Sequence, residues 1–486
     1  MKVFNYCIIL IIAAFTGGCQ PKNEGVNRQD PKTSEAKIFN IKSYGAIGDS
    51  ITMDTKSIQN AIDDCNSNGG GKIWIPAGKY QIGTIWLKSN ITLSLDHGAE
   101  LLGSQDLKDY PIDKLRPARE GQSECLLYAE DATNIRLEGL GVIDGRGTKE
   151  YFPRNSGPGG KDNRPRLLRF ENCENVTFSG LTYKNPAFWG LHLIDCKNIH
   201  FDAVTIKFRN NNDNNDGIDI DGCEDVLIEN CNINSGDDAV CLKSSLNPCK
   251  NIDVRNCILS SNTAPVKFGA SGSGGFIDVT ITNCYFYDSP MGAIKLELVD
   301  GGRMENVNIS RIVMENVGNP IFIRLGNRGR IFTDRSQDTS IVSPPVGSIK
   351  NIRISNVVAE VTIESLETAS RPADYKGDIY LTLEDRMSRS GPIMITGIPG
   401  HYVEDVVLEN IKISYPGRGT EEYAKKVVPE DEKRYPEQFF FGVLPAWGAY
   451  IRHARNITFK NVTMTTRDPD QREMIILDDV EGFVNE

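Results

Sequence analysis

The chain has 486 residues, 39% of them hydrophobic, and a formal net charge of −11 with a pI near 5.2. A chain of this length can bury a large core, and one long solenoid domain accommodates it as well as several globular domains would. The acidic balance argues against a nucleic-acid-binding protein, which normally carries a basic stripe and a high pI. It leaves an acidic polysaccharide open as a partner, because a local basic cleft can reverse the global sign.

The first 36 residues predict export. Residues 1–18 carry Lys2, an apolar run too short to cross a bilayer comfortably, and small residues before Cys19. This pattern resembles a bacterial lipoprotein signal, which implies lipidation of Cys19 and a location in the cell envelope, periplasmic or at the outer membrane. Thr16 stands where such signals usually carry leucine, so a plain export signal or a retained anchor stays open. Residues 19–36 predict a flexible tether, and the lipid anchor would be the only contact with a membrane.

Residues 37–486 are expected to form one domain that opens with a short helix. In residues 54–71, apolar side chains recur at helical spacing, Asp54 places an acidic group in the first turn, and glycines follow the last turn. We expect this amphipathic helix to cover the open end of a β-solenoid and to protect its exposed strand edge.

A short sequence phrase recurs along this domain. In each copy, Asn or Asp is followed by alternating apolar residues, many of them β-branched, which predicts a turn and then a strand. Successive cysteine-containing copies lie 23 to 27 residues apart, a period typical of a parallel β-helix, in which residues one period apart become neighbours on stacked coils. The predicted fold class is therefore all-β. The copies are ATNIRL (132–137), CENVTF (173–178), CKNIHF (196–201), CEDVLI (223–228), CKNIDV (249–254), MENVNI (304–309), IKNIRI (349–354), VEDVVL (403–408) and ARNITF (454–459).

The repeat also explains most of the 12 cysteines. Equivalent places in successive repeats predict one inward stack in which cysteine acts as a small hydrophobic residue. Disulfides stay open as an alternative for an exported chain. Zinc is disfavoured because no C-x-x-C pair or histidine cluster is present. The predicted stack consists of Leu181, Val204, Cys231, Cys257 and Cys284.

Two bursts of carboxylates are one coil apart. Asp216 and Asp237 are separated by 21 residues, so we expect them on adjacent coils at the same angular position. Asp219 and Asp238 would join them in one cleft, where crowding raises the pKa of one carboxyl while others stay ionised. Glycoside hydrolysis needs such a set, with one acid to protonate the leaving oxygen and one base. Turn residues chosen for backbone reasons, or a calcium site, remain alternative interpretations.

The acidic segments resemble those of a known family. NNDGID (214–219) and GDD (236–238) are similar to the N-T-D-G-x-D and G-D-D motifs of the polygalacturonase-like glycoside hydrolases, family 28. The resemblance covers nearly the whole chain after the tether. Further similar segments are YGAIGDS (44–50), GGGKIWIPAGKY (69–80), LKSNITLSLDHGAELLGS (87–104), GLGVIDGRG (139–147) and NPAFWGLH (185–192).

This resemblance implies a single-stranded, right-handed parallel β-helix that hydrolyses pectic glycosidic bonds with inversion, without a cofactor or a metal. Asp237 would be the general acid, and Asp216 and Asp238 would activate water. The partner would be an acidic polysaccharide or oligosaccharide. His192 could equally be a structural histidine, and the lysines could be solvated surface charges. The residues expected to bind substrate are Asn214, His192, Lys243, Lys267 and Lys295.

Two departures from the family pattern stand out. The family's G-H-G motif should fall in residues 260–269, which contain no histidine, and Thr263 or Ala264 takes its place. The R-I-K motif that holds a galacturonate carboxylate reads Ala-Ile-Lys at 293–295, so Lys295 remains and the arginine is lost. A lysine offers a point charge without bidentate recognition. These departures leave open a sugar other than plain galacturonate at the cleavage site, with Arg324 and Arg328 as further candidates for a basic rim.

Three functions stay open at this point. The first is a glycoside hydrolase acting on pectin-like substrates, including rhamnogalacturonan. The second is a calcium-dependent polysaccharide lyase that uses the acids as ligands, and the third is a non-catalytic glycan-binding β-helix. Residues 329–345 and 414–442 break the repeat and predict loops that wall one end of the cleft, which would favour exo-action.

Overall fold

The computed structural model describes residues 37–111, 114–155, 162–209, 212–332, 343–363 and 382–486. Residues 1–36, with the predicted signal, Cys19 and the tether, lie outside the described residues, so export and lipidation stay predictions. Among the residues described, no helix has the length and apolar character needed to cross a membrane.

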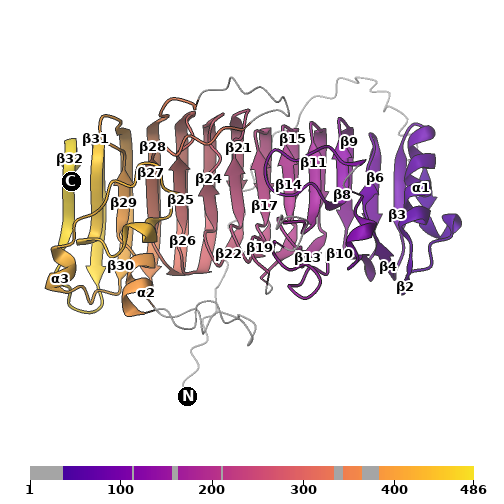
Figure 1. Ribbon diagram of the computed structural model, residues 1–486, viewed down its shortest axis with the longest axis horizontal. Helices are drawn as coiled ribbons and strands as arrows, with labels where there is room; N and C mark the ends of the chain where they lie inside the picture. Colours follow the sequence, from indigo (N-terminus) through magenta and orange to yellow (C-terminus); the bar gives the residue numbers. More distant parts are fainter. Residues whose placement is uncertain (1–36, 112–113, 156–161, 210–211, 333–342, 364–381) are drawn as a thin grey trace, which may run out of the picture. The chain divides into compact units, whose positions relative to one another are not determined.

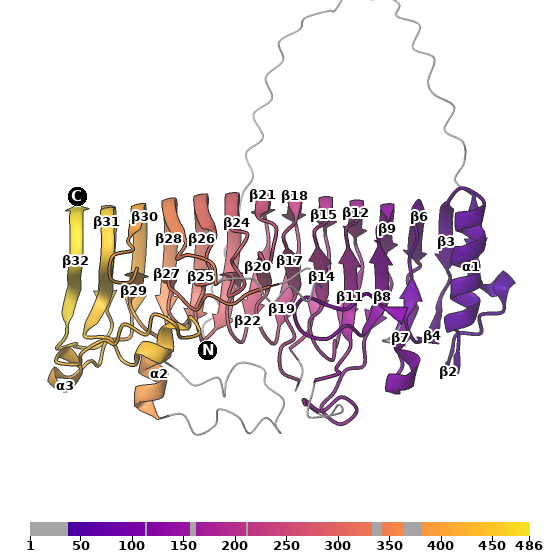
Figure 2. The same ribbon diagram turned by 45° about the horizontal axis from the view of Figure 1, so that its top comes forward.

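Three parallel sheets run along the domain, and each coil contributes a strand to each sheet (Figures 1 and 2). The first sheet begins with β1 (Ile38–Asn40), β3 (Gly71–Ile75), β6 (Ile91–Leu95), β9 (Thr133–Gly139), β12 (Glu174–Ser179), β15 (Lys197–Asp202), β18 (Glu224–Glu229) and β21 (Cys249–Arg255). The second begins with β2 (Asp49–Met53), β4 (Gly78–Ile82), β7 (Ala99–Gly103), β10 (Val142–Asp144), β13 (Thr182–Lys184), β16 (Thr205–Lys207), β19 (Asn232–Ser235) and β22 (Ile258–Ser261).

The third sheet carries the side chains discussed below. It contains β5 (Ile85–Trp86), β8 (Cys125–Glu130), β11 (Arg166–Glu171), β14 (Leu191–Ile194), β17 (Ile218–Asp221), β20 (Val240–Lys243), β23 (Val266–Phe268), β25 (Ile294–Leu298), β27 (Ile321–Leu325) and β29 (Ile393–Thr396). In the later coils, longer strands run through two or more sheets. They are β24 (Phe276–Ser289), β26 (Arg303–Val317), β28 (Ser348–Val361), β30 (Val403–Tyr415), β31 (Ala446–Thr466) and β32 (Glu473–Asn485). The predicted all-β fold of stacked parallel coils is confirmed.

Helix α1 (Thr55–Ser67) lies at the indigo end of this row of strands, opposite β32 (Figure 1). Its buried face packs against the first coil through Ile58, Ile62 and Cys65. The predicted cap is therefore present, although its first turn carries no acidic residue. Asp54 precedes the helix, and its carboxylate accepts from the amides of Ile47 at 2.7 Å and Gly48 at 2.9 Å. Two shorter helices, α2 (Leu383–Arg389) and α3 (Glu421–Ala424), belong to loops, as do the 3-10 turns η1 (Ile41–Tyr44), η2 (Leu107–Asp109) and η6 (Gln438–Phe441).

The repeated Asn or Asp forms a ladder at the turn before the first sheet. The side-chain amide of Asn198 donates to Oδ1 of Asn175 at 2.6 Å, and that of Asn175 donates to Oδ1 of Asn134 at 3.1 Å. These residues have φ of 52°, 59° and 57°, a left-handed conformation that asparagine tolerates better than most residues. Asp278 occupies the same place with φ of 57°. It belongs to a further copy of the phrase, FIDVTI (276–281), that the sequence analysis did not include.

The cysteine prediction is also confirmed. The register of the second sheet aligns the residues that follow Leu181, Val204, Cys231, Cys257 and Cys284 on successive coils. All five side chains are buried. Every cysteine of the described residues is a free thiol, so the disulfide interpretation is wrong for this part of the chain. Stacked thiols fill narrow space between coils as small apolar groups do.

The ladder predicts a stability cost for a side chain that cannot adopt its backbone conformation. We expect Asn198→Val to lower the free energy of unfolding by about 2 kcal/mol, because valine is strained at positive φ and removes one ladder hydrogen bond. Chemical denaturation followed by circular dichroism measures this. Lys207→Ala, at an exposed position of β16, should change it by less than about 0.5 kcal/mol. Equal effects of the two substitutions would contradict the role of the ladder.

Candidate active site

A row of polar side chains lies along the outer face of the third sheet. The strand register aligns His192, Asp219, Cys241, Lys267 and Lys295 on five successive coils. Neighbours in such a row are about 4.8 Å apart, while the alternate side chains enter the core. All five are buried, because residues outside the repeat pack over them.

Asp216 lies beside Asp238 of the next coil. The amide of Gly217 donates to the carbonyl of Asp238 at 2.8 Å, and the amide of Asp237 donates to the carbonyl of Asn215 at 3.3 Å. The first bond continues the 22-residue offset of the Ile218–Val240 pair and favours Asp238 opposite Asp216, whereas the second bond follows an offset of 21 and favours Asp237. The acids of the two adjacent coils therefore meet, with Asp216 close to both Asp237 and Asp238.

Asp237 is the most accessible of the four aspartates, with a half-buried side chain. Its Oδ2 accepts a hydrogen bond from the amide of Asn214 at 3.4 Å. Oδ1 of Asn214 accepts from Arg164 at 3.1 Å, which turns the amide group towards Asp237. A contact of Asn214 with substrate stays a prediction. The three buried aspartates are Asp216 (3% exposed), Asp219 (0%) and Asp238 (4%).

Thr263 joins two of these carboxyl groups. Its hydroxyl oxygen lies 3.0 Å from Oδ1 of Asp237 and 2.7 Å from Oδ1 of Asp238. Of the two residues that the sequence offered in place of the family's histidine, Thr263 therefore contacts the acids. A hydroxyl has one proton to donate and can also accept, so it suits a pair in which one carboxyl is protonated and the other ionised.

The pKa values of the adjacent acids shift in opposite directions. Burial, and then the charge of Asp238, raise the pKa of Asp237 to about 6. Burial also opposes ionisation of Asp238, but Lys267 and Lys295 outweigh it and lower the pKa of that carboxyl. Asp237 therefore holds a proton under mildly acidic conditions, whereas Asp238 is ionised.

The two upstream aspartates are harder to ionise. Burial raises the pKa of Asp219 to about 7. Burial and the neighbouring Asp219 raise the pKa of Asp216 well above its usual value. Among the three carboxylates expected to act in catalysis, Asp238 is thus the one whose surroundings favour the charged form.

Lys243 and Lys267 are the cations of this cluster. Lys243 Nζ lies 3.5 Å from Asp219 and 3.9 Å from Asp216, and also 4.3 Å from the centre of the Trp189 ring. Lys267 Nζ lies 3.3 Å from Asp238. Their side chains are 7% and 3% exposed, so the interpretation as solvated surface charges is wrong.

The donor atoms of the acid cluster suit calcium poorly. Oxygens of Asp216 and Asp238 and the sulfur of Cys241 lie within 4.8 Å of one another, but calcium prefers six to eight oxygen ligands. Here one donor is a sulfur atom, and each aspartate already has a lysine as its cationic neighbour.

His192 is 1% exposed and lies one coil before Asp219 in the row. Burial, and then the charges of Arg166 and Lys243, hold the pKa of its imidazole well below the usual value, so the ring is neutral. It packs edge-on against Trp189, with 5.1 Å between ring centres. Neither ring nitrogen has a hydrogen-bond partner among the described residues, and its contact with substrate stays a prediction.

Lys295 contacts a carboxylate that the sequence did not reveal. Its Nζ pairs with Oε2 of Glu437, and Lys267 lies 3.2 Å from Oε1 of the same residue. Tyr435 places its hydroxyl 3.1 Å from Lys267. Both residues belong to the predicted loop 414–442, which therefore reaches the lysines beside the acids. The length of this loop was the only feature of the sequence that pointed to it. Length alone did not identify Tyr435 or Glu437 as the residues that contact the lysines.

Arg324 and Arg328 hold loops in place and do not form a free basic rim. Arg324 donates to the carbonyl oxygens of Glu430 at 2.9 Å and Gly397 at 3.1 Å. Arg328 forms an ion pair with Asp300, with Nε 2.8 Å from Oδ1. Both guanidinium groups therefore stabilise the segments beside the third sheet through hydrogen bonds and an ion pair.

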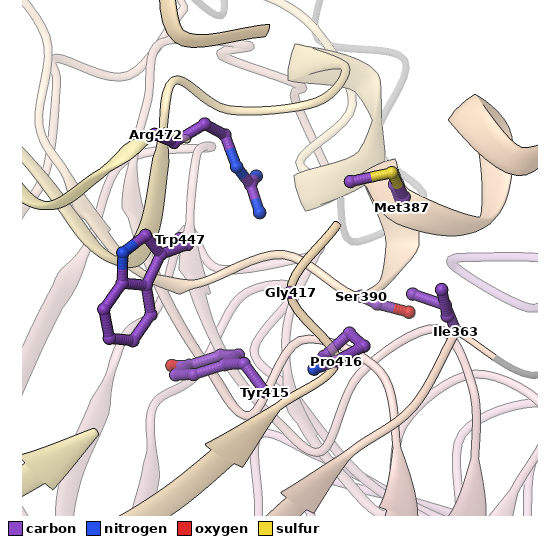
Figure 3. A pocket seen from close by; sticks show the side chains of 8 residues that line it. All are labelled: Ile363, Met387, Ser390, Tyr415, Pro416, Gly417, Trp447 and Arg472. Carbon is purple, nitrogen blue, oxygen red and sulfur yellow. The ribbon is translucent and has the colours of Figure 1, made fainter. Parts of the chain in front are cut away.

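A small pocket lies elsewhere, where β30 leads into its following loop (Figure 3). Tyr415, Trp447 and Arg472 are among its lining residues, and its cavity volume is about 10 Å³, enough for one water molecule. None of the four aspartates lines this pocket, so it is separate from the acid cluster.

Known proteins share this sequence and fold. Residues 65–368 match the family model "Glycosyl hydrolases family 28". A probable polygalacturonase of Vitis vinifera is 30% identical over 70% of this chain and 72% of its own length. The chain therefore belongs to glycoside hydrolase family 28.

Two further relatives of the family 28 hydrolase are bacterial. The exo-poly-alpha-D-galacturonosidase of Dickeya chrysanthemi is 27% identical over 59% of this chain, which spans 56% of that relative's length. The family 28 exopolygalacturonase of Yersinia enterocolitica superposes with a TM-score of 0.69 and 22% identity, over 92% of this chain and 78% of its own. The predicted family, the right-handed β-helix and the glycosidase class are confirmed.

The buried lysine yields a stability prediction for the family 28 hydrolase. Lys267→Met leaves Asp238 and Glu437 short of positive charge, so we expect the free energy of unfolding at pH 7 to fall by about 3 kcal/mol. Both carboxyls have pKa values lowered in the folded protein. The stability that they contribute is present above their unfolded pKa and is lost as the pH falls through the folded pKa.

The deficit of Lys267→Met should therefore shrink as the pH falls through the folded pKa values of both carboxyls, because a protonated carboxyl no longer needs the lysine. Urea unfolding at several pH values tests this. Lys250→Met, at an exposed ion pair with Glu224, should cost less than about 1 kcal/mol at every pH. A deficit for Lys267→Met that does not change with pH would contradict the electrostatic explanation.

Proposed function

We propose that this family 28 glycosidase hydrolyses a glycosidic bond in a pectic polysaccharide or oligosaccharide, with inversion at the anomeric carbon. The observation that carries the proposal is the adjacent pair of Asp237 and Asp238, whose pKa values are shifted in opposite directions. One protonated acid and one ionised base are what the inverting reaction requires. The names of the polygalacturonase relatives support the pectic substrate.

In this mechanism, Asp237 is the general acid. Its half-buried carboxyl faces the accessible side of the cluster and donates its proton to the leaving glycosidic oxygen. Asp238 removes a proton from the water whose oxygen attacks the anomeric carbon, and Asp216 beside it holds that water. Inverting enzymes commonly separate the two carboxyl groups by about 6.5 to 9.5 Å. Asp237 and Asp238 are consecutive residues that share a contact with Thr263, so a shorter separation here is not by itself a sign of retention.

The loop 414–442 supports exo-action. Glu437 reaches the lysines of β23 and β25, and the carbonyl of Glu432 accepts from the amide of Asn327 at 2.6 Å. A wall on this side of the acids would stop a long chain from passing through, so cleavage would occur near a chain end. Early release of mid-length fragments from a long polymer would contradict exo-action while leaving hydrolysis untouched.

Asp237→Asn should lower kcat by about 10²- to 10⁴-fold, because the amide cannot protonate the leaving oxygen. Product analysis on polygalacturonan, rhamnogalacturonan and their oligosaccharides measures it. Asp63→Asn on the surface of α1 is the matched control and should keep wild-type activity. Chelator should have no effect, and products should lack the ultraviolet absorption of a new double bond. Unsaturated products lost with chelator would instead indicate a lyase.

Thr263→Val should lower kcat by about tenfold and move the acidic limb of the kcat/KM profile to higher pH. The hydroxyl favours the ionised form of Asp238, so its loss raises the pKa of the base, and more protons must leave before water is activated. Thr263→Ser keeps the hydroxyl and should restore both values. A valine variant with an unmoved pH profile would show that Thr263 only fills space.

A further inference from the structure

The lysine that would meet a uronate carboxylate is already paired with a carboxylate of the chain. Glu437 places one oxygen against Lys295 and the other 3.2 Å from Lys267. Glu437 is 5% exposed, Lys267 3% and Lys295 0%. One carboxylate thus bridges two lysines of adjacent coils, as the carboxylate of a bound sugar acid would do.

The charges of this cluster are balanced without a ligand. Burial opposes ionisation of Glu437, but Lys295 and Lys267 outweigh it and lower its pKa, so it is ionised. Asp238 is the second ionised carboxyl. Burial raises the pKa of Glu297 to about 8, so this neighbour is neutral below that pH. Two lysines therefore face two carboxylates, and a third carboxylate would be an unpaired charge in a buried site, which is costly.

The accessible group above the lysines is an aromatic ring. Tyr435 is 44% exposed, and Lys267 Nζ lies 5.3 Å from its ring centre. An aromatic face offers an apolar surface with a polar tip and suits the C–H face of a sugar without a charged substituent.

The other side of the acids carries a buried cation, Arg166, whose Nη2 donates to the carbonyl oxygen of Glu120 and whose charge interacts with Asp219. Arg166 is 1% exposed, and its Nε and Nη1 have no hydrogen-bond partner among the described residues. Its guanidinium group lies 4.9 Å from the Trp189 ring centre. A buried guanidinium with free donors is the group that a carboxylate would satisfy.

We propose that the sugar bound on the Lys267–Lys295 side of the catalytic aspartates is neutral, that Glu437 excludes a uronate there, and that the uronate of the substrate lies on the Arg166 side. This inference rests on the proposed pectic function. It narrows the substrate class to glycans in which a uronic acid is linked to a neutral sugar.

The test compares kcat/KM for two sets of oligosaccharides of equal length. Homogalacturonan oligomers place a uronate on both sides of any cleaved bond, whereas rhamnogalacturonan oligomers alternate galacturonic acid with neutral rhamnose. The wild type should prefer the alternating set by about tenfold or more, which corresponds to one unpaired charge contact. Glu437→Gln should move that ratio towards homogalacturonan by about tenfold. Glu432→Gln, in the same loop, is the charge-matched control and should leave it unchanged.

The outcomes separate the two proposals. Equal or preferred cleavage of homogalacturonan by the wild type would overturn the inference while keeping the pectic hydrolase, and this needs no variant. An unchanged ratio in a folded Glu437→Gln protein, checked by its melting temperature, would also overturn it. If neither set is cleaved, the pectic function itself is wrong and the inference falls with it.

Discussion

Parallel hydrogen bonding between successive coils fixes each residue beside its counterpart one coil away, so like groups stack on like groups. In the core this is favourable, because apolar side chains and thiols fill the space between coils. At the turns it builds the ladder in which Asn198 donates to Asn175. On the outer face of the third sheet the same constraint would stack like charges, which repel. There, Lys267 and Lys295 do stack on adjacent coils, and carboxylates of other segments compensate their charge.

The crowding that this stacking imposes is also what makes the acids useful. Four aspartates on two adjacent coils cannot all ionise, so protons remain among them at pH values where an isolated aspartate has none. The lysines of the next two coils then decide which carboxyl is charged. They lie near Asp238 and hold its pKa down, while Asp237 stands one residue earlier and keeps its proton. The proposed roles of acid and base thus fall to two consecutive residues of one coil, because Lys267 forms its ion pair with the second of them.

A feature of this fold could be predicted from sequence when its residues lie within one or two repeats of each other. The coils, the cysteine stack, the cap helix and the meeting of the aspartates depend on patterns within one or two repeats. The pair of Lys295 and Glu437 spans 142 residues and involves a loop outside the repeat. No periodicity marks a residue such as Glu437. From the sequence alone, Lys267 and Lys295 therefore seemed free to bind a substrate.

The loops can change in sequence without disturbing the stacked strands, whereas the coils cannot. A change in a coil disturbs the register of its neighbours, whereas the segment with Tyr435 and Glu437 is held at its flanks, through Asn327 and Arg324, and replaces no strand. It reaches the lysines beside the acids without altering the aspartates. A glycosidase of this fold can therefore change which sugar it accepts by filling a carboxylate site from a loop, while the arrangement that breaks the bond stays the same. The lost arginine at Ala293 fits this view, since a site that binds its own glutamate has no need of a bidentate clamp.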